Sequence, residues 1–427
     1  MRKLEHSNAT GEIRSLLKGQ LLAYLVGFYI FAFYMELHKR ISFLETIRFQ
    51  FVFGAIIGTL CCYKFLTERK MFYGLNSVTK VVLSYLFLMG IYTIFSMDRE
   101  TSLVVYSDRV LKFSLVSFFI YVATSKVEDL RVIIAFMLLA WLKIASEGFV
   151  GWGTGSMMWE NQGIQRLHGS TIMFRHPNSY SGFAVGCLAF GYFLLSAVKS
   201  KLIKLFLLIL LTFSLVIVVT TGSRTGYVAV AIGTIFIFFK MKKGRAKLLV
   251  IGIATLIVGL NVVSEDYKQR FQSIFTGEEK EGQSSEARLQ IIEDAFLVFA
   301  EHPMGVGVAA FPKVRMDMFN RFQDTHNLYL EILTNLGPLG IILFILFVSK
   351  LIALSRSNIR HVLDGGSFTP ADKMFLVGLT KAVIGFILLR LLLGLFGMDM
   401  YEIYWWLSLG ITLSVTKLTH KYSSPSK

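Results

Sequence analysis

The sequence is poor in charged residues, in cysteine and in recognisable catalytic motifs, and each shortage excludes a class of protein. Charged residues make up 17% of the chain, whereas soluble domains carry about 25%, so a soluble globular domain is excluded. Cys61, Cys62 and Cys187 all lie within apolar runs, which leaves neither a disulfide framework nor a metal-binding spacing. No Walker motif, Asp-rich metal motif or nucleophile elbow occurs outside the apolar runs.

Apolar runs long enough to cross a bilayer fill most of the chain instead. Hydrophobic residues account for 54% of it, and the mean hydropathy is +0.59. The first twenty residues are polar, so we expect no cleavable signal peptide. Since a spanning helix needs about 20 apolar residues, the sequence predicts an all-α, polytopic integral membrane protein with about twelve spans. The expected spans are 20–36, 46–64, 79–97, 108–124, 131–149, 179–198, 202–220, 225–240, 246–264, 328–350, 373–396 and 402–418.

Lysine and arginine cluster in alternate short loops between these runs, which sets the expected orientation. The net charge of +16 is therefore a topology signal rather than a nucleic-acid-binding surface. Both termini are expected on the cytoplasmic side. The chain then divides into spans one to nine (1–264), a large periplasmic loop (265–327) and the last three spans (328–427). No nucleic-acid partner is expected, and the lipid bilayer is the surrounding partner.

The large loop has internal structure of its own in the sequence. After a charged stretch at 277–285, apolar residues recur at helical spacing up to Pro303, which predicts an amphipathic helix at the membrane surface or over a cavity mouth. Gly305 and Gly307 follow. Because glycine allows tight turning and leaves backbone N–H groups accessible, both are candidate substrate-binding positions.

Three polar residues at the outward ends of spans are the candidates for chemistry. Arg224 lies in a short junction between two spans, where it can bind a diphosphate bidentately or snorkel to lipid headgroups. Arg288 opens the amphipathic segment, either as a second cation of the site or as a solvated charge. His326 has an unperturbed pKa near neutrality, so it can accept a proton from a sugar hydroxyl; alternatively, it and Asn327 cap the helix that follows.

Further polar residues are weaker candidates. The stretch Arg175-His176-Pro177-Asn178 could line the same cavity, although a capping asparagine at the start of a span explains part of that pattern. Charged residues in or near the ends of spans could bind a lipid-linked phosphate or pair with each other, because charge inside a membrane usually faces a bundle interior. These residues are Lys143, Glu147, Lys381 and Arg390.

Three motifs occur together in the second half of the chain: His326-Asn327 followed by Gly337-x-x-Gly340, the Ser223-Arg224 junction, and Arg288 followed by the Pro303-x-Gly305-x-Gly307 turn. Together they resemble the O-antigen ligase superfamily, which includes lipopolysaccharide O-antigen ligases, polysaccharide polymerases and protein O-oligosaccharyltransferases. The resemblance covers most of the chain and is strongest over 205–345. Ile341 follows Gly340, where ligases usually have Gly, Thr or Tyr, so the polymerase alternative stays open.

The resemblance implies an enzyme of the bacterial inner membrane whose active site faces the periplasm. Arg224 and Arg288 would bind the diphosphate of an undecaprenyl-diphosphate-linked glycan, and His326 would activate the acceptor hydroxyl. Asn327, Arg175, Asn178, Gly305 and Gly307 are the expected substrate-binding residues. The family is thought to invert the anomeric centre without a metal or cofactor, since arginines can stabilise a diphosphate leaving group electrostatically.

The expected reaction is therefore transfer of the glycan to a hydroxyl of the lipid A-core oligosaccharide. The alternative within the class is a polymerase, whose acceptor is another lipid-linked glycan. A polysaccharide transporter or flippase is the alternative from another class, and it predicts charges in related halves with no need for His326. A non-catalytic scaffold would tolerate lysine in place of the outward-facing arginines, whereas a bidentate site would not.

Overall fold

The computed structural model describes residues 20–68, 77–161, 163–240, 265–276, 284–365 and 367–423. Six of its helices are long and apolar enough to cross a membrane. They are α5 (Phe49–Thr67), α6 (Ser77–Ile94), α9 (Val127–Thr154), α11 (Lys201–Thr220), α17 (Leu328–Asp364) and α18 (Pro370–Leu393). These helices make the protein a multi-pass membrane protein.

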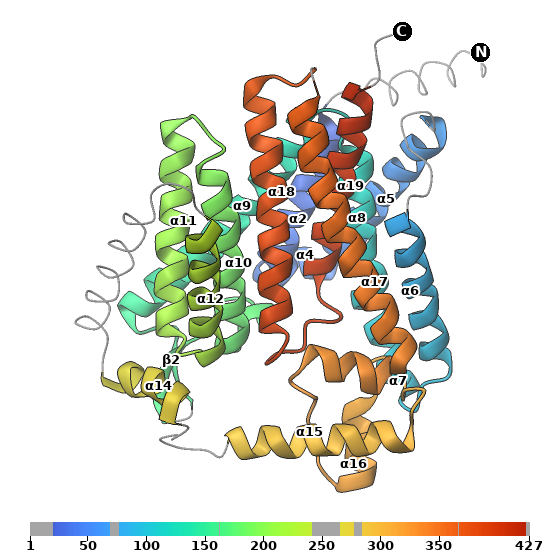
Figure 1. Ribbon diagram of the computed structural model, residues 1–427, viewed down its shortest axis with the longest axis vertical. Coiled ribbons are helices and arrows are strands. Elements are labelled where there is room, and N and C mark those ends of the chain that lie inside the picture. Colours follow the sequence, from blue (N-terminus) through green and yellow to red (C-terminus); the bar gives the residue numbers. More distant parts are fainter. Residues whose placement is uncertain are drawn as a thin grey trace.

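Five further helices run beside them in the same bundle (Figure 1). They are α2 (Leu21–Tyr34), α8 (Lys112–Ala123), α10 (Pro177–Leu195), α12 (Arg224–Lys240) and α19 (Ile403–Ser423). Every expected span except 246–264 overlaps one of these eleven helices, and 246–264 lies outside the described residues. The helical membrane architecture is confirmed, while the count of twelve spans stays a prediction.

Short elements cover one end of the bundle, drawn at the bottom of Figure 1. The helices α14 (Glu265–Thr276), α15 (Ser284–Glu301) and α16 (Phe311–Phe319) come from the loop expected at 265–327. The strands β1 (Met158–Asn161) and β2 (Ile164–Leu167) form an antiparallel hairpin, which the sequence did not predict. The remaining short elements are α3 (Leu37–Arg40), α4 (Ser42–Thr46), α7 (Arg99–Val105), the π-helical turn η2 (Tyr106–Leu111) and the 3₁₀ turn η3 (Ile172–Phe174).

The amphipathic helix expected after residue 285 is α15, and it ends before Pro303 as predicted. Ile291, Ala295 and Val298 are buried on one face, and Ala295 and Val298 pack with residues of α16. Leu289 and Phe296 are more than half exposed on the other face. The helix therefore presents apolar residues both to the protein and outward, as expected of a helix at a membrane surface.

Helix α10 is central to the bundle, because it packs against α11, α12 and α18. Aromatic rings fill the space between α9, α10 and α18. The Trp141 ring lies edge-on to the Phe190 ring with centroids 5.2 Å apart, and the Phe386 ring lies 6.3 Å from Trp141. Ring pairs of this kind add to the stabilisation from burial, so the packing of α9, α10 and α18 gives a rigid support to the residues at the ends of these helices.

Helix α17 is broken at Gly337, whose φ and ψ of 61° and −164° are accessible essentially to glycine alone. Pro338 follows, and its ring and missing N–H prevent the helix from continuing normally. The freed carbonyl oxygens of Thr334 and Asn335 accept hydrogen bonds from the backbone N–H groups of Val306 and Gly307, both at 2.9 Å. The break thus docks the 303–307 turn onto the membrane helix and keeps its polar groups paired.

Replacing Gly337 with alanine should destabilise the protein. The new Cβ would lie 2.5 Å from the Met304 carbonyl oxygen, and the backbone conformation alone costs alanine about 1–3 kcal/mol. We expect a lower thermal-unfolding midpoint for the detergent-solubilised protein. Gly153→Ala is the matched control, since a Cβ there meets nothing within 4 Å. Equal midpoints for the two variants would contradict the role given to the break.

Candidate functional site

A cavity of about 470 Å³ lies at the end of the bundle covered by α15. It is bounded by the start of α10, the start of α12, the first turns of α15, the segment before α17 and the connection from α18 to α19. Its polar lining residues are His176, Asn178, Ser179, Thr225, Arg288, Gln323, His326, Arg390, Asp399, Glu402 and Tyr404. Two of the three principal candidates, Arg288 and His326, therefore meet at one cavity with the weaker candidate Asn178.

His326 is held at this cavity by an unusual backbone. Its φ of 47° lies in the left-handed region, which is uncommon for a residue other than glycine. The side chain of Asn327 explains why the chain can turn here, because its Oδ1 accepts from the N–H groups of Tyr329 and Leu330 and so caps α17. The cap fixes where the helix starts, and the left-handed turn places His326 at the cavity.

The surroundings of His326 favour its neutral form. Burial lowers the pKa of its imidazole below the usual 6.5, and the positive charges of Arg288 and Arg315 lower the pKa further. The Gln323 Nε2 lies 3.0 Å from the His326 Nε2, a geometry in which the amide donates to an unprotonated ring nitrogen. At neutral pH the imidazole can therefore accept a proton, as a general base must.

Arg288 lies in the first turns of α15, and two ion pairs anchor that helix. Asp294, one and a half turns further on, is 3% exposed and pairs with Arg315 of α16 at 2.8 Å. It also pairs with Arg321 at 3.1 Å. Since both arginines lie between α15 and His326 in the chain, the buried carboxylate ties the helix bearing Arg288 to the segment bearing His326.

Arg224 is the first residue of α12, and its neighbour Thr225 lines the cavity, although Arg224 itself does not. The turn before it is held by Arg166 of β2, which is 1% exposed. Arg166 donates to the Thr221 carbonyl at 2.7 Å and to the Asn178 Oδ1 at 2.6 Å. Arg166 thus fixes two parts of the cavity wall together, the turn that begins α12 and the start of α10.

Helix α18 contributes Arg390 to the cavity lining, a residue that the sequence analysis placed among four undecided charges. Its guanidinium lies 3.3 Å from the Asp399 carboxylate and stacks on the Tyr404 ring, 3.4 Å from the ring centroid. Glu402 also lines the cavity and pairs with Arg109 at 2.9 Å. Burial raises the pKa of the Glu402 carboxyl, and Arg109 opposes that rise. The cavity lining therefore contains both cations, Arg288 and Arg390, and carboxylates, Asp399 and Glu402, with Arg390 and Asp399 in contact.

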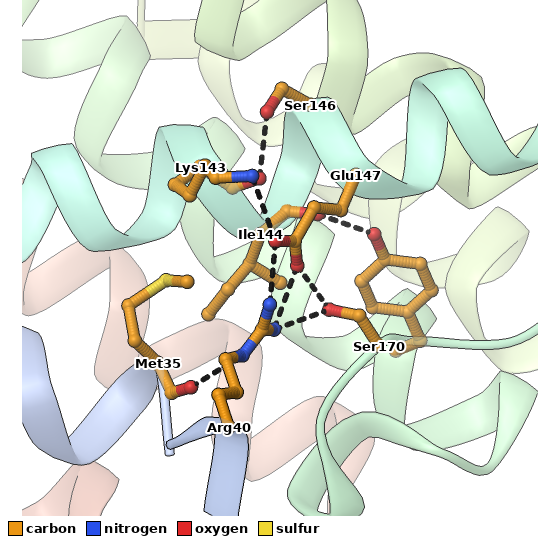
Figure 2. Close-up of polar contacts among 8 residues, drawn as sticks. Met35, Arg40, Lys143, Ile144, Ser146, Glu147 and Ser170 are labelled. Atoms are coloured by element: carbon orange, nitrogen blue, oxygen red, sulfur yellow. Dashed lines mark hydrogen bonds and ion pairs between the residues drawn. The ribbon is translucent and has the colours of Figure 1, made fainter. Parts of the chain in front are cut away.

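Two more of the undecided charges, Lys143 and Glu147 of α9, pair with each other (Figure 2). Glu147 accepts from both terminal nitrogens of Arg40, at 2.7 and 2.8 Å, and from Ser170. Ser170 belongs to the segment that leads to Met173, a lining residue of the cavity. This cluster thus positions a cavity wall, and the pairing alternative holds for Lys143 and Glu147.

The other expected substrate-binding residues lie away from the cavity lining. Asn327 uses its side-chain oxygen for the helix cap, and its Nδ2 donates to the Leu395 carbonyl at 3.1 Å. Gly307 donates to the Asn335 carbonyl at the break in α17, and Gly305 lies so close to Gly337 that a Cβ on it would be 2.7 Å from the Gly337 nitrogen. Arg175 is exposed beside the N-cap of α10. Their assignment to substrate binding stays a prediction, whereas their structural contacts are observed.

His176, from the weak candidate stretch 175–178, also lines the cavity and is the N-cap of α10. Burial lowers the pKa of its imidazole to about 4, with Arg166 and His326 adding to the effect. Sequence reasoning missed the lining residues Gln323 and Tyr404, which carry no motif. It also missed Arg166, an isolated charge in a short strand that holds the wall without lining the cavity. Asp399 lies in an outward loop between two spans, and this position could have identified it as a candidate residue of an outward-facing site. Within the described ranges, the structure assembles no group of three His, Cys, Asp or Glu side chains suited to a metal ion.

Comparison with known proteins adds one finding to this geometry. Residues 209–345 match the model of a family described as O-Antigen ligase. That segment includes Arg224, Arg288 and His326, while Asn178, Arg390 and Asp399 lie outside it. No curated protein matches the chain. The match confirms the resemblance seen in the motifs: residues 209–345 of this multi-pass membrane protein, about a third of the chain, are similar to the O-antigen ligase domain.

Proposed function

We propose that this protein transfers a glycan from undecaprenyl diphosphate to a hydroxyl of the lipid A-core oligosaccharide, on the periplasmic face of the bacterial inner membrane. At family level the chain is a ligase- or polymerase-like membrane glycosyltransferase. The observation that carries the finer proposal is the meeting of His326, Arg288 and Arg390 at one cavity. A base and cations facing one space are what transfer from a diphosphate carrier requires.

The proposed step breaks the bond between the anomeric carbon and the diphosphate oxygen. The acceptor hydroxyl oxygen attacks that carbon from the opposite side, so the anomeric configuration inverts, and His326 takes the hydroxyl proton. The bonding electrons leave with undecaprenyl diphosphate, which gains one negative charge. Arg288 and Arg224 would stabilise that charge, because a guanidinium fits diphosphate oxygens bidentately.

A deletion strain complemented with the wild type or with His326→Ala tests the proposal. A ligase predicts that long glycan accumulates on undecaprenyl diphosphate and that lipid A-core stays bare when His326 is replaced. Single repeats capped on core, or stalled on the carrier, would indicate the polymerase instead. Unchanged envelope glycan with His326→Ala would remove His326 from the mechanism and favour a transporter.

The proposed orientation has its own test, because the cavity must face the periplasm. A variant without Cys61, Cys62 and Cys187 would receive one new cysteine at either of two exposed lysines. Lys313 lies at the end of the bundle with the cavity, and Lys199 lies in the turn before α11 at the other end. We expect a membrane-impermeant maleimide to label Lys313→Cys in cells with a permeabilised outer membrane and to spare Lys199→Cys. The reverse pattern would place the cavity in the cytoplasm.

Metal independence is part of the same proposal. If arginines alone stabilise the leaving diphosphate, transfer by the purified enzyme should proceed unchanged after exhaustive chelation. The measurement is the initial rate with and without a chelator, followed by addition of Mg²⁺ or Mn²⁺. A rate that falls on chelation and recovers with either cation would require an ionic cofactor.

A further inference from the structure

Arg390 occupies a slot that the sequence of α10 provides. Gly182 and Gly186 lie one turn apart on the face of α10 that meets α18. A Cβ on Gly182 would lie 3.3 Å from Nη1 of Arg390, and a Cβ on Gly186 would lie 2.6 Å from the Phe386 ring and 3.5 Å from Nη2. The two glycines thus let α18 pack closely with its guanidinium between the helices, where Arg390 is 3% exposed and the Tyr404 ring lies over its plane.

The hydrogen bonds of this guanidinium are incomplete among the described residues. Its Nη2 donates to the Gly182 carbonyl at 2.9 Å, and its Nη1 donates to the Asp399 Oδ2 at 3.3 Å. The second contact is long, since charge-assisted N–H···O bonds usually measure about 2.7–2.9 Å. In the part of the chain that the structure describes, the buried Nε has no hydrogen-bond partner. A buried cation with an unpaired donor lowers the stability of the fold. Its presence at this site therefore calls for a functional explanation.

Asp399 is a counter-ion that a ligand can replace. Its side chain is 18% exposed, and it lies in the connection between α18 and α19 rather than within a helix. Both Asp399 and Arg390 line the cavity that contains His326 and Arg288. An anion entering the cavity would meet the Arg390 guanidinium in competition with the Asp399 carboxylate.

We propose that Arg390 binds the diphosphate of the lipid carrier, and that the diphosphate displaces the Asp399 carboxylate from the guanidinium. Arg390 of α18 then binds the diphosphate from a different helix than Arg288, which lies on the covering helix α15. The identity of the ligand rests on the proposed function, whereas the anion-binding slot rests on the geometry of α10 and α18. The rival explanation is that Arg390 and Asp399 form a purely structural ion pair. The two explanations predict different effects of Asp399→Asn on the affinity for the carrier: tighter binding if the diphosphate displaces Asp399, and unchanged binding if the pair is structural.

The test is a binding titration of undecaprenyl diphosphate to the full chain in phosphatidylcholine nanodiscs. Arg390→Met should weaken binding about ten- to a hundredfold, because it removes hydrogen bonds to a charged ligand. Asp399→Asn should tighten binding about three- to tenfold, because it removes the competing carboxylate. The double variant should bind as weakly as Arg390→Met. Arg131→Lys, at the opposite end of the bundle and paired with Asp372, is the control and should bind like the wild type.

The thermal-unfolding midpoint of each variant separates binding from folding. A structural ion pair predicts that each single variant lowers the midpoint, that the double variant restores it, and that affinity is unchanged in every folded variant. If Arg390→Met does not fold, the change in carrier affinity of Asp399→Asn decides alone. Weaker or unchanged binding of the carrier by Asp399→Asn then overturns the inference. A wild type that does not bind the carrier would overturn the proposed donor as well. A wild type that binds no better than Arg390→Met would overturn only the role of Arg390.

Discussion

Replacing His326 with alanine is expected to lower the rate of glycan transfer about 10²–10⁴-fold, the usual contribution of a general base. The loss should appear in the chemical step, because the variant removes the proton acceptor and leaves the cations of the cavity in place. Binding of undecaprenyl diphosphate should therefore change little. The measurement is the single-turnover rate with purified protein, donor and acceptor, beside a binding titration of the carrier.

His302→Ala is the matched control for this prediction. His302 lies in the same extramembrane layer, just after α15, and is outside the lining of the cavity. Its substitution should leave the rate within about twofold of the wild type, as expected for a surface change. A His326→Ala variant that keeps the full rate, or an equal loss in both variants, would contradict the assignment of the base.

Much of the helical architecture could be predicted because hydropathy is a strong signal. Each described span coincides with a run of apolar residues, and α15 ends before Pro303 as its periodicity indicated. The break at Gly337 was harder to foresee, since the role of that glycine depends on the 303–307 turn lying against it. The His326-Asn327…Gly337-x-x-Gly340 motif thus contains both a candidate site residue and the glycine at which α17 is broken.

The polar partners in the cavity depend on tertiary packing, which explains why they were missed. Asn327 looked like a substrate ligand from its place beside His326, yet its amide is used to cap α17 and to hold Leu395. Arg390 could not be distinguished from Lys143, because both are charges in apolar helices. Only the fold shows that Lys143 pairs with Glu147, whereas Arg390 lines the cavity beside Asp399.

Replacing Arg288 with methionine should have two separable effects on transfer. First, the rate should fall about 10²–10³-fold, because one donor to the developing diphosphate charge is lost. Second, the acid limb of the pH profile should move to higher pH. Arg288 is the largest charge lowering the pKa of His326, after burial, so its removal raises that pKa toward 6.5. A raised pKa means that more of the imidazole is protonated, and unable to accept a proton, at any pH near the limb.

The shift in the acid limb distinguishes Arg288 from a cation that only binds substrate, because loss of a remote binding contact lowers the rate without moving the limb. Arg321→Met is the control. Arg321 is a cation beside the same helix, where it pairs with Asp294 of α15, but it is not among the charges that lower the pKa of His326. We expect its pH profile to match the wild type. If Arg288→Met lowers the rate with the limb unmoved, Arg288 acts on the donor alone. A limb that moves to lower pH would contradict the effect assigned to Arg288, since the loss of a nearby positive charge raises the pKa of a histidine rather than lowering it.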